Sequence, residues 1–326
     1  LNVSQTITIR VEGRDYSVSR GTRVKAFLRR HFPDREPACF GALANRRLLD
    51  LESPIAASCE LVPLTFRHKE GQRIYRASLT MVFIEAVERV FPGARVQVGQ
   101  SLGDGYFFDI LKATPVTAAD IGAIEAEMRA MIARNEPLAV MRMPAPAAIE
   151  LFEGLGRRET ADLIRIKRRN WVALVTMGRY VDLWHQPLLP TAEMLKTFRL
   201  DAYADGVVLS MPPAGRVDEL PDSPSNHKGL FAAYRETRGW NRRVGVERLA
   251  DLNHAIIDGS IGEVIRVSEA LHERKIASIA DDVQARSGCR LVLVAGPSSS
   301  GKTTFVKRLR MQLLAIGVRP NSELAK

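Results

Sequence analysis

A glycine-bounded loop in the last tenth of the chain constrains the fold more than any other feature. It reads Gly-Pro-Ser-Ser-Ser-Gly-Lys-Thr-Thr over residues 296–304 and fits the phosphate-binding pattern G-x-x-x-x-G-K-[ST]. A loop that wraps phosphates needs glycines, because a Cβ would keep its N–H groups from converging. We therefore predict that nucleotide is bound by Gly296, Pro297, Ser298, Ser299, Ser300, Gly301, Lys302, Thr303 and Thr304.

The residues beside this loop favour the same interpretation. The apolar run 290–295 is typical of a buried parallel strand, and residues 304–314 have the pattern of a helix whose positive end faces the loop. Lys302 is the predicted catalytic residue, since its ammonium group would reach the outer phosphates, and Thr303 would ligate nucleotide-bound Mg²⁺. A plain Gly/Ser loop with a stray lysine is the alternative, and the strand and helix that flank the loop argue against it.

Composition limits the class of protein. A chain of 326 residues exceeds what one hydrophobic core ordinarily supports and indicates several domains. The chain has neither an apolar run of about 20 residues nor a signal-peptide pattern, which predicts a cytoplasmic protein without a membrane partner. Cys39, Cys59 and Cys289 lack C-x-x-C spacing, so we expect core or near-core residues rather than disulfides or a zinc site.

The net charge of +10 and a pI near 9.8 favour a polyanionic partner such as RNA or nucleotides. Two basic clusters stand out, and the alternative that each is an ordinary solvated helix face stays open. They are Arg20, Arg23, Lys25, Arg29 and Arg30, and Arg157, Arg158, Arg165, Lys167, Arg168 and Arg169.

The first 65 residues have the pattern of a compact α+β module. Residues 7–11 alternate apolar and polar side chains, and after a turn at 13–15 residues 16–18 do so again, which predicts a β-hairpin. A helix should follow with Thr22 as its N-cap and with Val24, Phe27 and Leu28 buried. Short strands are expected at 38–40, 48–49 and 61–62, with a turn at Asn45-Arg46.

Helical periodicity dominates the rest of the chain. One amphipathic helix should begin near Ser78 and end before Pro92, and a second should lie between a Thr117-x-x-Asp120 cap and Pro137. Residues 211–228 have the composition of a linker, and a capping box at Ser260-x-x-Glu263 should open one or two long helices. His272 and Glu273 are adjacent on such a helix and point in different directions, which argues against a metal site.

Two stretches carry a resemblance to known families. Residues 6–66 resemble a TGS domain, the β-grasp module of threonyl-tRNA synthetases and some GTPases. The motifs Phe-Pro-Gly-Ala at 91–94, Val-Gly at 98–99 and Gly-Tyr-Phe-Phe-Asp at 105–109 resemble the second additional domain of those synthetases, in which an editing site hydrolyses mischarged tRNA.

That editing site has a His-x-x-x-His pair and a Cys-x-x-x-His pair, and the matching positions here are Ala77, Met81, Trp184 and Leu188. None of these four side chains can supply a nitrogen or thiolate ligand or a general base. The resemblance therefore implies a degenerate domain without zinc, and an active editing hydrolase is disfavoured. His185 survives beside the lost positions, but a lone histidine is more often an ordinary, partly buried residue than a ligand.

The serine-rich loop at 295–305 is similar to that of the uridine kinase and phosphoribulokinase family. Together with the synthetase-like modules it resembles fused bacterial nucleoside kinases. That resemblance implies an enzyme that moves the γ-phosphoryl group of ATP or GTP, with Mg²⁺, to the 5′-hydroxyl of a nucleoside. The alternative is an RNA- or tRNA-binding regulatory protein with a nucleotide-binding switch and an inactive editing-like domain. The sequence leaves the oligomeric state open.

The predicted fold is α+β and multidomain. It has a β-grasp TGS-like domain at 1–66, an α+β synthetase editing-like domain at 67–210, a linker and helical connector at 211–285, and the first strand, loop and helix of a P-loop α/β kinase domain at 286–326. The acidic residue, nucleoside pocket and lid that such kinases use would follow the loop helix. We therefore expect most of the kinase domain to be absent from this sequence, and the fragment alone to be inactive.

Overall fold

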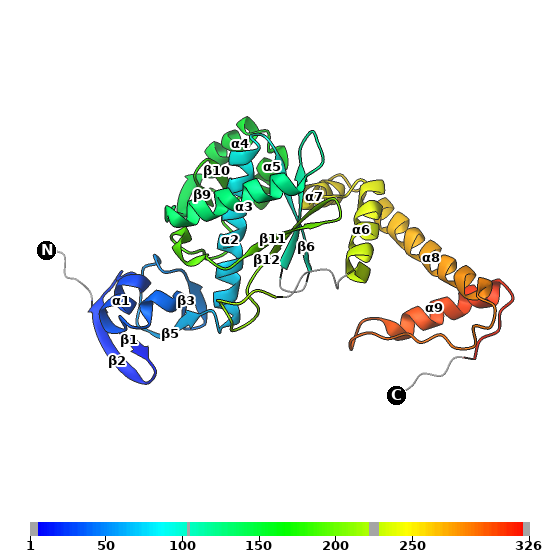
Figure 1. Ribbon diagram of the computed structural model, residues 1–326, viewed down its shortest axis with the longest axis horizontal. Helices are drawn as coiled ribbons and strands as arrows, with labels where there is room; N and C mark the ends of the chain where they lie inside the picture. Colours follow the sequence, from blue (N-terminus) through cyan, green and yellow to red (C-terminus); the bar gives the residue numbers. More distant parts are fainter. Residues whose placement is uncertain (1–5, 103–104, 222–227, 322–326) are drawn as a thin grey trace. The chain divides into compact units, whose positions relative to one another are not determined.

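The computed structural model describes residues 6–102, 105–221 and 228–321, which form two compact units divided between Tyr234 and Arg235 (Figure 1). The first unit has three sheets with helices packed on them, and the second is helical. The predicted α+β class is confirmed. The four predicted domain ranges remain a prediction, and the units are described separately below.

The first sheet has the order β2-β1-β5-β3-β4, with β1 and β5 parallel. Helix α1 packs on it through Val24, Phe27 and Leu28, which are all buried as predicted. Glu12 and Gly13 make the β1–β2 turn with positive φ, and Asn45 and Arg46 do the same between β3 and β4. The elements are β1 (Thr6–Val11), β2 (Arg14–Ser19), α1 (Val24–His31), η1 (Glu36–Ala38), β3 (Cys39–Ala44), β4 (Arg47–Leu49) and β5 (Cys59–Thr65).

Helix α2 (Lys69–Val90) joins this sheet to the rest of the first unit. The Tyr75 ring lies 5.2 Å from Phe66 and 5.9 Å from Phe40, so the end of the helix nearest the β-grasp part is packed into that part's core. Further along, Leu79, Phe83 and Val87 are buried in the same continuous core. Figure 1 shows α2 in cyan, running from the blue β-grasp part into the middle of the unit.

A four-stranded sheet with the order β11-β12-β7-β6 packs against α2 and α3. Helix α3 begins with the predicted capping box, in which Thr117 and Asp120 each accept a hydrogen bond from the other's backbone N–H. Its predicted apolar face is confirmed, because Ile121, Ile124, Met128 and Ile132 are all buried. These elements are β6 (Arg95–Leu102), β7 (Gly105–Leu111), α3 (Ala118–Ala133), η2 (Ala192–Met194), β11 (Arg199–Tyr203) and β12 (Gly206–Ser210).

A three-stranded sheet with the order β10-β9-β8 has two different faces. Val172 and Leu174 of β9 pack on one side against α4 and α5, around Phe152 and Ile164. Val175 and Met177 point to the other side and join the core of α2, since successive strand residues alternate between faces. The elements are β8 (Ala139–Pro144), α4 (Ala145–Gly154), α5 (Arg158–Lys167), β9 (Trp171–Met177) and β10 (Tyr180–Leu183).

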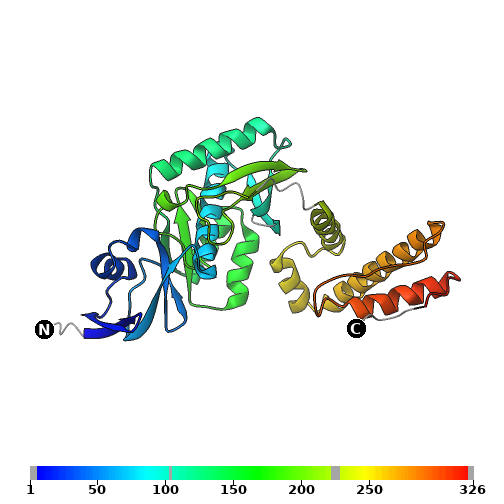
Figure 2. The same ribbon diagram turned by 60° about the horizontal axis from the view of Figure 1, so that its bottom comes forward.

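Helix α6 (Lys228–Arg243) contributes Phe231 to the first unit, where its ring lies 4.8 Å from Phe107. The second unit contains α7 (Leu249–Ile257), α8 (Ile261–Ala285) and α9 (Lys302–Ala315). Helices α8 and α9 lie side by side, visible in Figure 2 as the orange and red helices, and bury Ile276, Ala280, Leu309 and Leu313 between them.

Several predicted boundaries were wrong. Helix α2 begins at Lys69, and Ser78 lies inside it, where its hydroxyl donates to the Ile74 carbonyl oxygen. The predicted helix left out the polar run 69–73, in which Gly71 is needed because a Cβ there would lie 2.2 Å from the Thr65 carbonyl oxygen. Arg23, not Thr22, is the N-cap of α1, and Ser260 caps α8 without a side-chain hydrogen bond.

The strand predicted at 290–295 does not form, and Leu291 and Leu293 are 73% and 82% exposed. A strand needs hydrogen-bonded neighbours, and the described residues place none beside this segment. Residues 211–221 form no helix or strand, and 222–227 lie outside the described residues, so the linker at 211–228 stays a prediction. Cys39 is buried and Cys59 half-buried as expected, but Cys289 is exposed. No described helix is long and apolar enough to cross a membrane.

Candidate functional site

A cavity of about 500 Å³ lies between α2, the β9–β10 hairpin and the edge of the four-stranded sheet. Its α2 side is formed by residues at spacings of three and four, so one helix face points into it. Its floor is mostly apolar, and two arginines lie on the same helix face. The lining residues are Arg73, Arg76, Ala77, Thr80, Met81, Ile84, Val98, Tyr106, Val175, Tyr180, Asp182, Leu183, His185, Gln186 and Leu188.

Three of the four positions matched to the editing site line this cavity, although more than 100 residues separate the two pairs in sequence. Ala77, Met81 and Leu188 line it directly. Trp184 continues β10, since its N–H donates to the Ala173 carbonyl oxygen at 2.9 Å, and its ring is partly buried against the core of α2. Its indole Nε1 is buried without an acceptor among the described residues. Apolar bulk thus occupies the place of the predicted ligands.

The polar side chains left in the cavity do not form a hydrolytic centre. The Asp182 carboxylate accepts from the Tyr180 hydroxyl and from the Leu183 N–H, so it stabilises its own strand. Burial raises the pKa of Tyr180 well above its usual range, and its hydroxyl stays protonated at neutral pH. His185 lies at the lining, and the described residues contain no group of three or more His, Cys, Asp or Glu side chains that could hold a metal ion.

A second cavity of about 370 Å³ adjoins the first and shares Ile84, Tyr180 and Asp182 with it. Arg157 crosses this cavity, with its guanidinium 4.5 Å from the centre of the Tyr180 ring and a 2.7 Å hydrogen bond to the Val181 carbonyl oxygen. Arg95 and Arg179 also line it. The two cavities therefore form one groove in which arginines outnumber carboxylates.

Sequence reasoning missed the arginines of this groove. Arg73 precedes Ala77 by four residues and Arg76 precedes it by one, and both line the cavity that Met81 also lines. The spacing of Arg73 from Ala77 could have indicated that they share one helix face. Because the helix was expected to begin near Ser78, the prediction did not place these residues on it.

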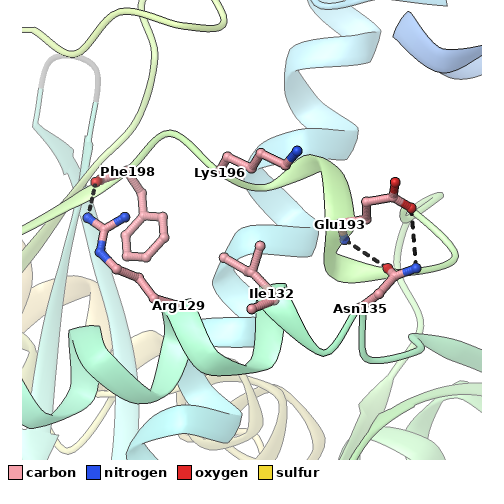
Figure 3. Close-up of a pocket in the computed structure, with 7 residues that line it drawn as sticks. Arg129, Ile132, Asn135, Glu193, Lys196 and Phe198 are labelled. Carbon is pink, nitrogen blue, oxygen red and sulfur yellow. Dashed lines mark hydrogen bonds between the residues drawn. The ribbon is translucent and has the colours of Figure 1, made fainter.

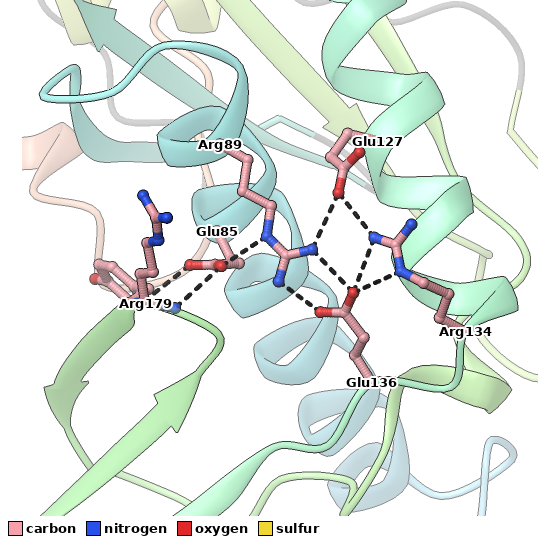
Figure 4. Close-up of polar contacts among 7 residues, drawn as sticks. Glu85, Arg89, Glu127, Arg134, Glu136 and Arg179 are labelled. Carbon is pink, nitrogen blue, oxygen red and sulfur yellow. Dashed lines mark hydrogen bonds and ion pairs between the residues drawn. The ribbon is translucent and has the colours of Figure 1, made fainter.

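A buried carboxylate holds the β9–β10 hairpin, which contributes lining residues to the groove (Figure 4). The Glu85 side chain is fully buried and accepts hydrogen bonds from the backbone N–H groups of Arg179 at 3.1 Å and Tyr180 at 2.9 Å. Arg89 Nε donates to the same carboxylate at 2.7 Å. This pairing compensates the buried charge, which would otherwise be strongly destabilising. Glu85 is therefore a positioning residue for Tyr180 and Asp182.

The same network extends to the end of α3. Arg89 also donates to Glu127 at 3.0 Å and to Glu136 at 2.6 Å, and Arg134 pairs with both of these glutamates at 2.9 Å. The hydrogen bonds from Arg89, followed by those from Arg134, lower the pKa of Glu136. Helices α2 and α3 are thus tied together by charge as well as by packing.

We expect acid to weaken this ion-pair network between α2 and α3. Since the folded-state pKa of Glu136 lies below its unfolded value, its stabilising contribution is present above the unfolded pKa of about 4.3 and is lost as pH falls through the folded pKa. Glu136→Gln should cost about 1–3 kcal/mol at pH 7 and should flatten the acid limb of stability. Urea unfolding at pH 7 and pH 3.5 measures both. Glu219→Gln, which removes an exposed pair with Arg216, is the control. An equal effect of the two variants would contradict this account.

A third cavity, of about 540 Å³, lies between α3 and the segment before β11 (Figure 3). Arg129 stacks on the Phe198 ring at 4.7 Å, and Asn135 exchanges two hydrogen bonds with Glu193, at 3.2 and 3.1 Å. Most of its polar groups already have partners, and we assign it no ligand.

The predicted phosphate-binding loop closes over itself at the start of α9. Ser299 and Gly301 have positive φ of 61° and 78°, and Lys302 Nζ donates to the Pro297 carbonyl oxygen at 2.7 Å. A Cβ on Gly296 would lie 2.8 Å from Ser300 Oγ, so only glycine fits there without displacement. No acidic residue stands in the first turn of α9. The loop thus gathers backbone N–H groups and one ammonium at a helix N-terminus, an arrangement suited to phosphate.

Helix α9, which follows the loop, packs against α8 of the same unit. Arg308 pairs with Glu273 at 2.7 Å and contacts His272, which explains these two α8 residues without a metal. Whether residues 296–304 bind nucleotide stays a prediction.

The basic clusters are only partly available to a partner. Arg157 is held by Tyr180, and Arg165 is paired with Glu153 and Asp162. In contrast, Lys167, Arg168 and Arg169 have no partner among the described side chains, and neither do Lys25, Arg29 and Arg30 of the N-terminal cluster. Arg23 is paired with Glu52.

The structure thus defines an arginine-lined groove in the first unit and, in the second unit, a loop suited to phosphate. The chain is similar to threonine–tRNA ligases. It is 27% identical to that of Nitratidesulfovibrio vulgaris over 196 residues, 34% identical to that of Methylococcus capsulatus over 163, and 30% identical to that of Maridesulfovibrio salexigens over 194. These matches cover 60%, 49% and 59% of this chain. No protein-family model matches it.

The matched segments span 30%, 26% and 30% of those relatives, so the chain corresponds to less than a third of their length. The similarity supports the synthetase-like part of the sequence prediction. It gives no support to a nucleoside kinase, which the structure alone does not establish either.

Proposed function

We propose that residues 6–211 form an RNA-binding module in which an editing-type pocket has become a binding groove. One observation carries this proposal: the groove retains an arginine-rich lining while apolar side chains stand at all four positions where the family has hydrolytic ligands. The similarity to ligases that act on tRNA makes tRNA the preferred partner. Contacts between the groove arginines and RNA phosphates would give the positive charge of the groove a role in binding.

Salt dependence tests this function. The chain should bind tRNA with an affinity that falls steeply with salt. Arg73→Gln with Arg179→Gln should reduce the slope of log K against log[salt] by about 1.4–1.8, because each lost phosphate contact removes about 0.7–0.9. Both side chains are exposed and lack partners among the described residues. Arg274→Gln with Arg310→Gln is a charge-matched control in the second unit. An unchanged slope in the groove variant, or no measurable binding, would refute the proposal.

The module should also be inert as a hydrolase. Mischarged tRNA incubated with the chain should lose its amino acid no faster than in buffer, because apolar side chains stand at the matched ligand positions and the described residues contain no cluster that could hold a metal ion. Acid-gel measurement of charged tRNA over time detects any turnover, and a rate above background would overturn the degenerate assignment.

The loop supports a second candidate function, a nucleoside kinase that uses ATP or GTP. The positive-φ residues, the close fit at Gly296 and the position of Lys302 favour triphosphate binding. Thr303 would hold Mg²⁺ beside the phosphates, and the metal would neutralise their charge. Phosphorylation of uridine or cytidine by the full-length protein tests this candidate. A nucleotide-binding loop without phosphorylation would favour a regulatory switch on the RNA module.

A further inference from the structure

One face of the three-stranded sheet is left open at its outer end. Trp171, the first residue of β9, is 60% exposed, and Val140 of β8 is 46% exposed. An exposed indole of this size is uncommon on a soluble surface and marks a contact site when polar groups surround it. No described element covers it.

The strand register places this tryptophan on the groove side of the sheet. Trp171 pairs with Pro144, Ala173 with Arg142, and Val175 with Val140. Directly paired residues share a face, and so do alternate residues of one strand. Because Val175 lines the larger cavity, Trp171 and Arg142 point to the same side as that cavity. Four residues of strand separate Trp171 from Val175, or roughly 14 Å.

The charge around the tryptophan is uncompensated. Arg142 has no partner among the described side chains, and neither have Arg168 and Arg169, which immediately precede Asn170 and Trp171. The last two arginines line a cavity of about 470 Å³ beside α4 whose lining contains no carboxylate. Arg142 thus shares the face of the open indole, while Arg168 and Arg169 lie at the same end of β9 and line the cavity on its α4 side.

We propose that this surface, the Trp171 platform (Arg142 and Trp171 on the sheet face, with Arg168 and Arg169 at the same end of β9), binds a single-stranded RNA segment. A base stacks on the Trp171 indole, the arginines contact the phosphates on either side, and the strand continues along the sheet face toward Val175. A paired base in a duplex has no free face to offer, so the platform selects unpaired nucleotides. The inference rests on the proposed RNA-binding function and names the form of RNA that it recognises.

Stacking and charge give separable signatures. Base–aromatic stacking tolerates any sequence and is independent of salt, whereas the arginine contacts release counterions. Trp171→Ala should therefore weaken binding of a fluorescent oligouridine of about eight nucleotides by roughly 10-fold without changing the salt slope. Trp171→Phe should retain most of the affinity. Neutralising Arg142, Arg168 and Arg169 to glutamine should lower the salt slope, and the same change at Lys25, Arg29 and Arg30 is the matched control.

Anisotropy titrations with this oligomer, with a duplex of similar length and with intact tRNA decide the matter, and circular dichroism checks that each variant is folded. Unchanged oligouridine affinity in Trp171→Ala, with tRNA still bound, refutes the platform alone and leaves the proposed function standing. The same result is expected if the platform instead binds an extended peptide along the edge of β8. Failure of the wild-type chain to bind any of the three RNAs overturns both the platform and the proposed RNA-binding function.

Discussion

Replacing Gly178 by alanine is expected to lower the free energy of unfolding by about 3–5 kcal/mol, the cost of breaking a buried charge pair. Gly178 makes the turn between β9 and β10 with φ of +56°. A Cβ at this position would lie 2.0 Å from Glu85 Oε1 and 2.6 Å from an Arg89 nitrogen. The carboxylate must therefore move, and its hydrogen bonds to Arg179 and Tyr180 are lost.

Guanidinium-induced unfolding measures this loss, and Gly93→Ala is the matched control. Gly93 also has positive φ, at +84°, but nothing lies within 4 Å of the position of its Cβ. Its substitution should cost only the backbone strain of the left-handed region, about 1–2 kcal/mol. If the two variants lost the same stability, strain alone would explain Gly178 and the contact with Glu85 would be irrelevant.

The hairpin links this stability effect to function. Tyr180, Asp182 and Leu183 follow Gly178 directly and line the groove. A displaced turn should therefore weaken tRNA binding even in the fraction of Gly178→Ala that remains folded. Gly13→Ala, at a positive-φ glycine outside the groove, should bind in proportion to its folded fraction. The buried Glu85 thus controls the groove without lining it.

The local parts of the fold were predictable from sequence because they depend on neighbouring residues. The Thr117-x-x-Asp120 capping box satisfies backbone donors within one turn, and it forms as predicted. The β1–β2 hairpin has alternating side chains and a Gly13 that accepts positive φ. Each of these features is specified within about five residues, and no distant partner can easily override it.

The contacts that organise the groove were not predictable in this way. Glu85 and Tyr180 are hydrogen-bonded although 95 residues separate them, and nothing in the local pattern of α2 distinguishes Glu85 from a solvated glutamate. The start of α2 was missed because Gly71 and the polar residues around it imitate a loop. Tertiary contacts with Thr65 and Phe66 stabilise that first turn instead.

The degenerate positions were found by resemblance, and the structure adds their surroundings. Ala77, Met81 and Leu188 indeed share one cavity, but the arginines beside them and the open Trp171 face are properties of this chain's own packing. Loss of chemistry at a site therefore does not imply loss of binding, because the groove's shape is set by α2 and the hairpin rather than by the missing ligands.

Lys302→Ala should weaken binding of a fluorescent ATP analogue by roughly 10–100-fold, since a charge-assisted hydrogen bond to phosphate is worth about 1.5–3 kcal/mol. The ammonium group now donates to the Pro297 carbonyl oxygen, so it is turned back onto the loop that precedes α9. The substitution removes this cation but leaves Gly296, Gly301 and the helix N-terminus intact, and residual binding by backbone N–H groups should persist. Fluorescence titration with Mg²⁺ measures both affinities.

Lys307→Ala is the control, because Lys307 carries the same charge on α9 but lies beyond the first turn, where the helix N-terminus no longer acts. Its effect should be several-fold smaller than that of Lys302→Ala, because its charge lies roughly 7–8 Å further along the helix axis and is screened by solvent and salt. In the full-length protein, Lys302→Ala should also lower any uridine phosphorylation by about 10²–10³-fold, as loss of one preorganised donor does elsewhere. Equal losses from both lysines would show that the loop attracts nucleotide only through its overall positive charge, and the phosphate-binding assignment would then fail.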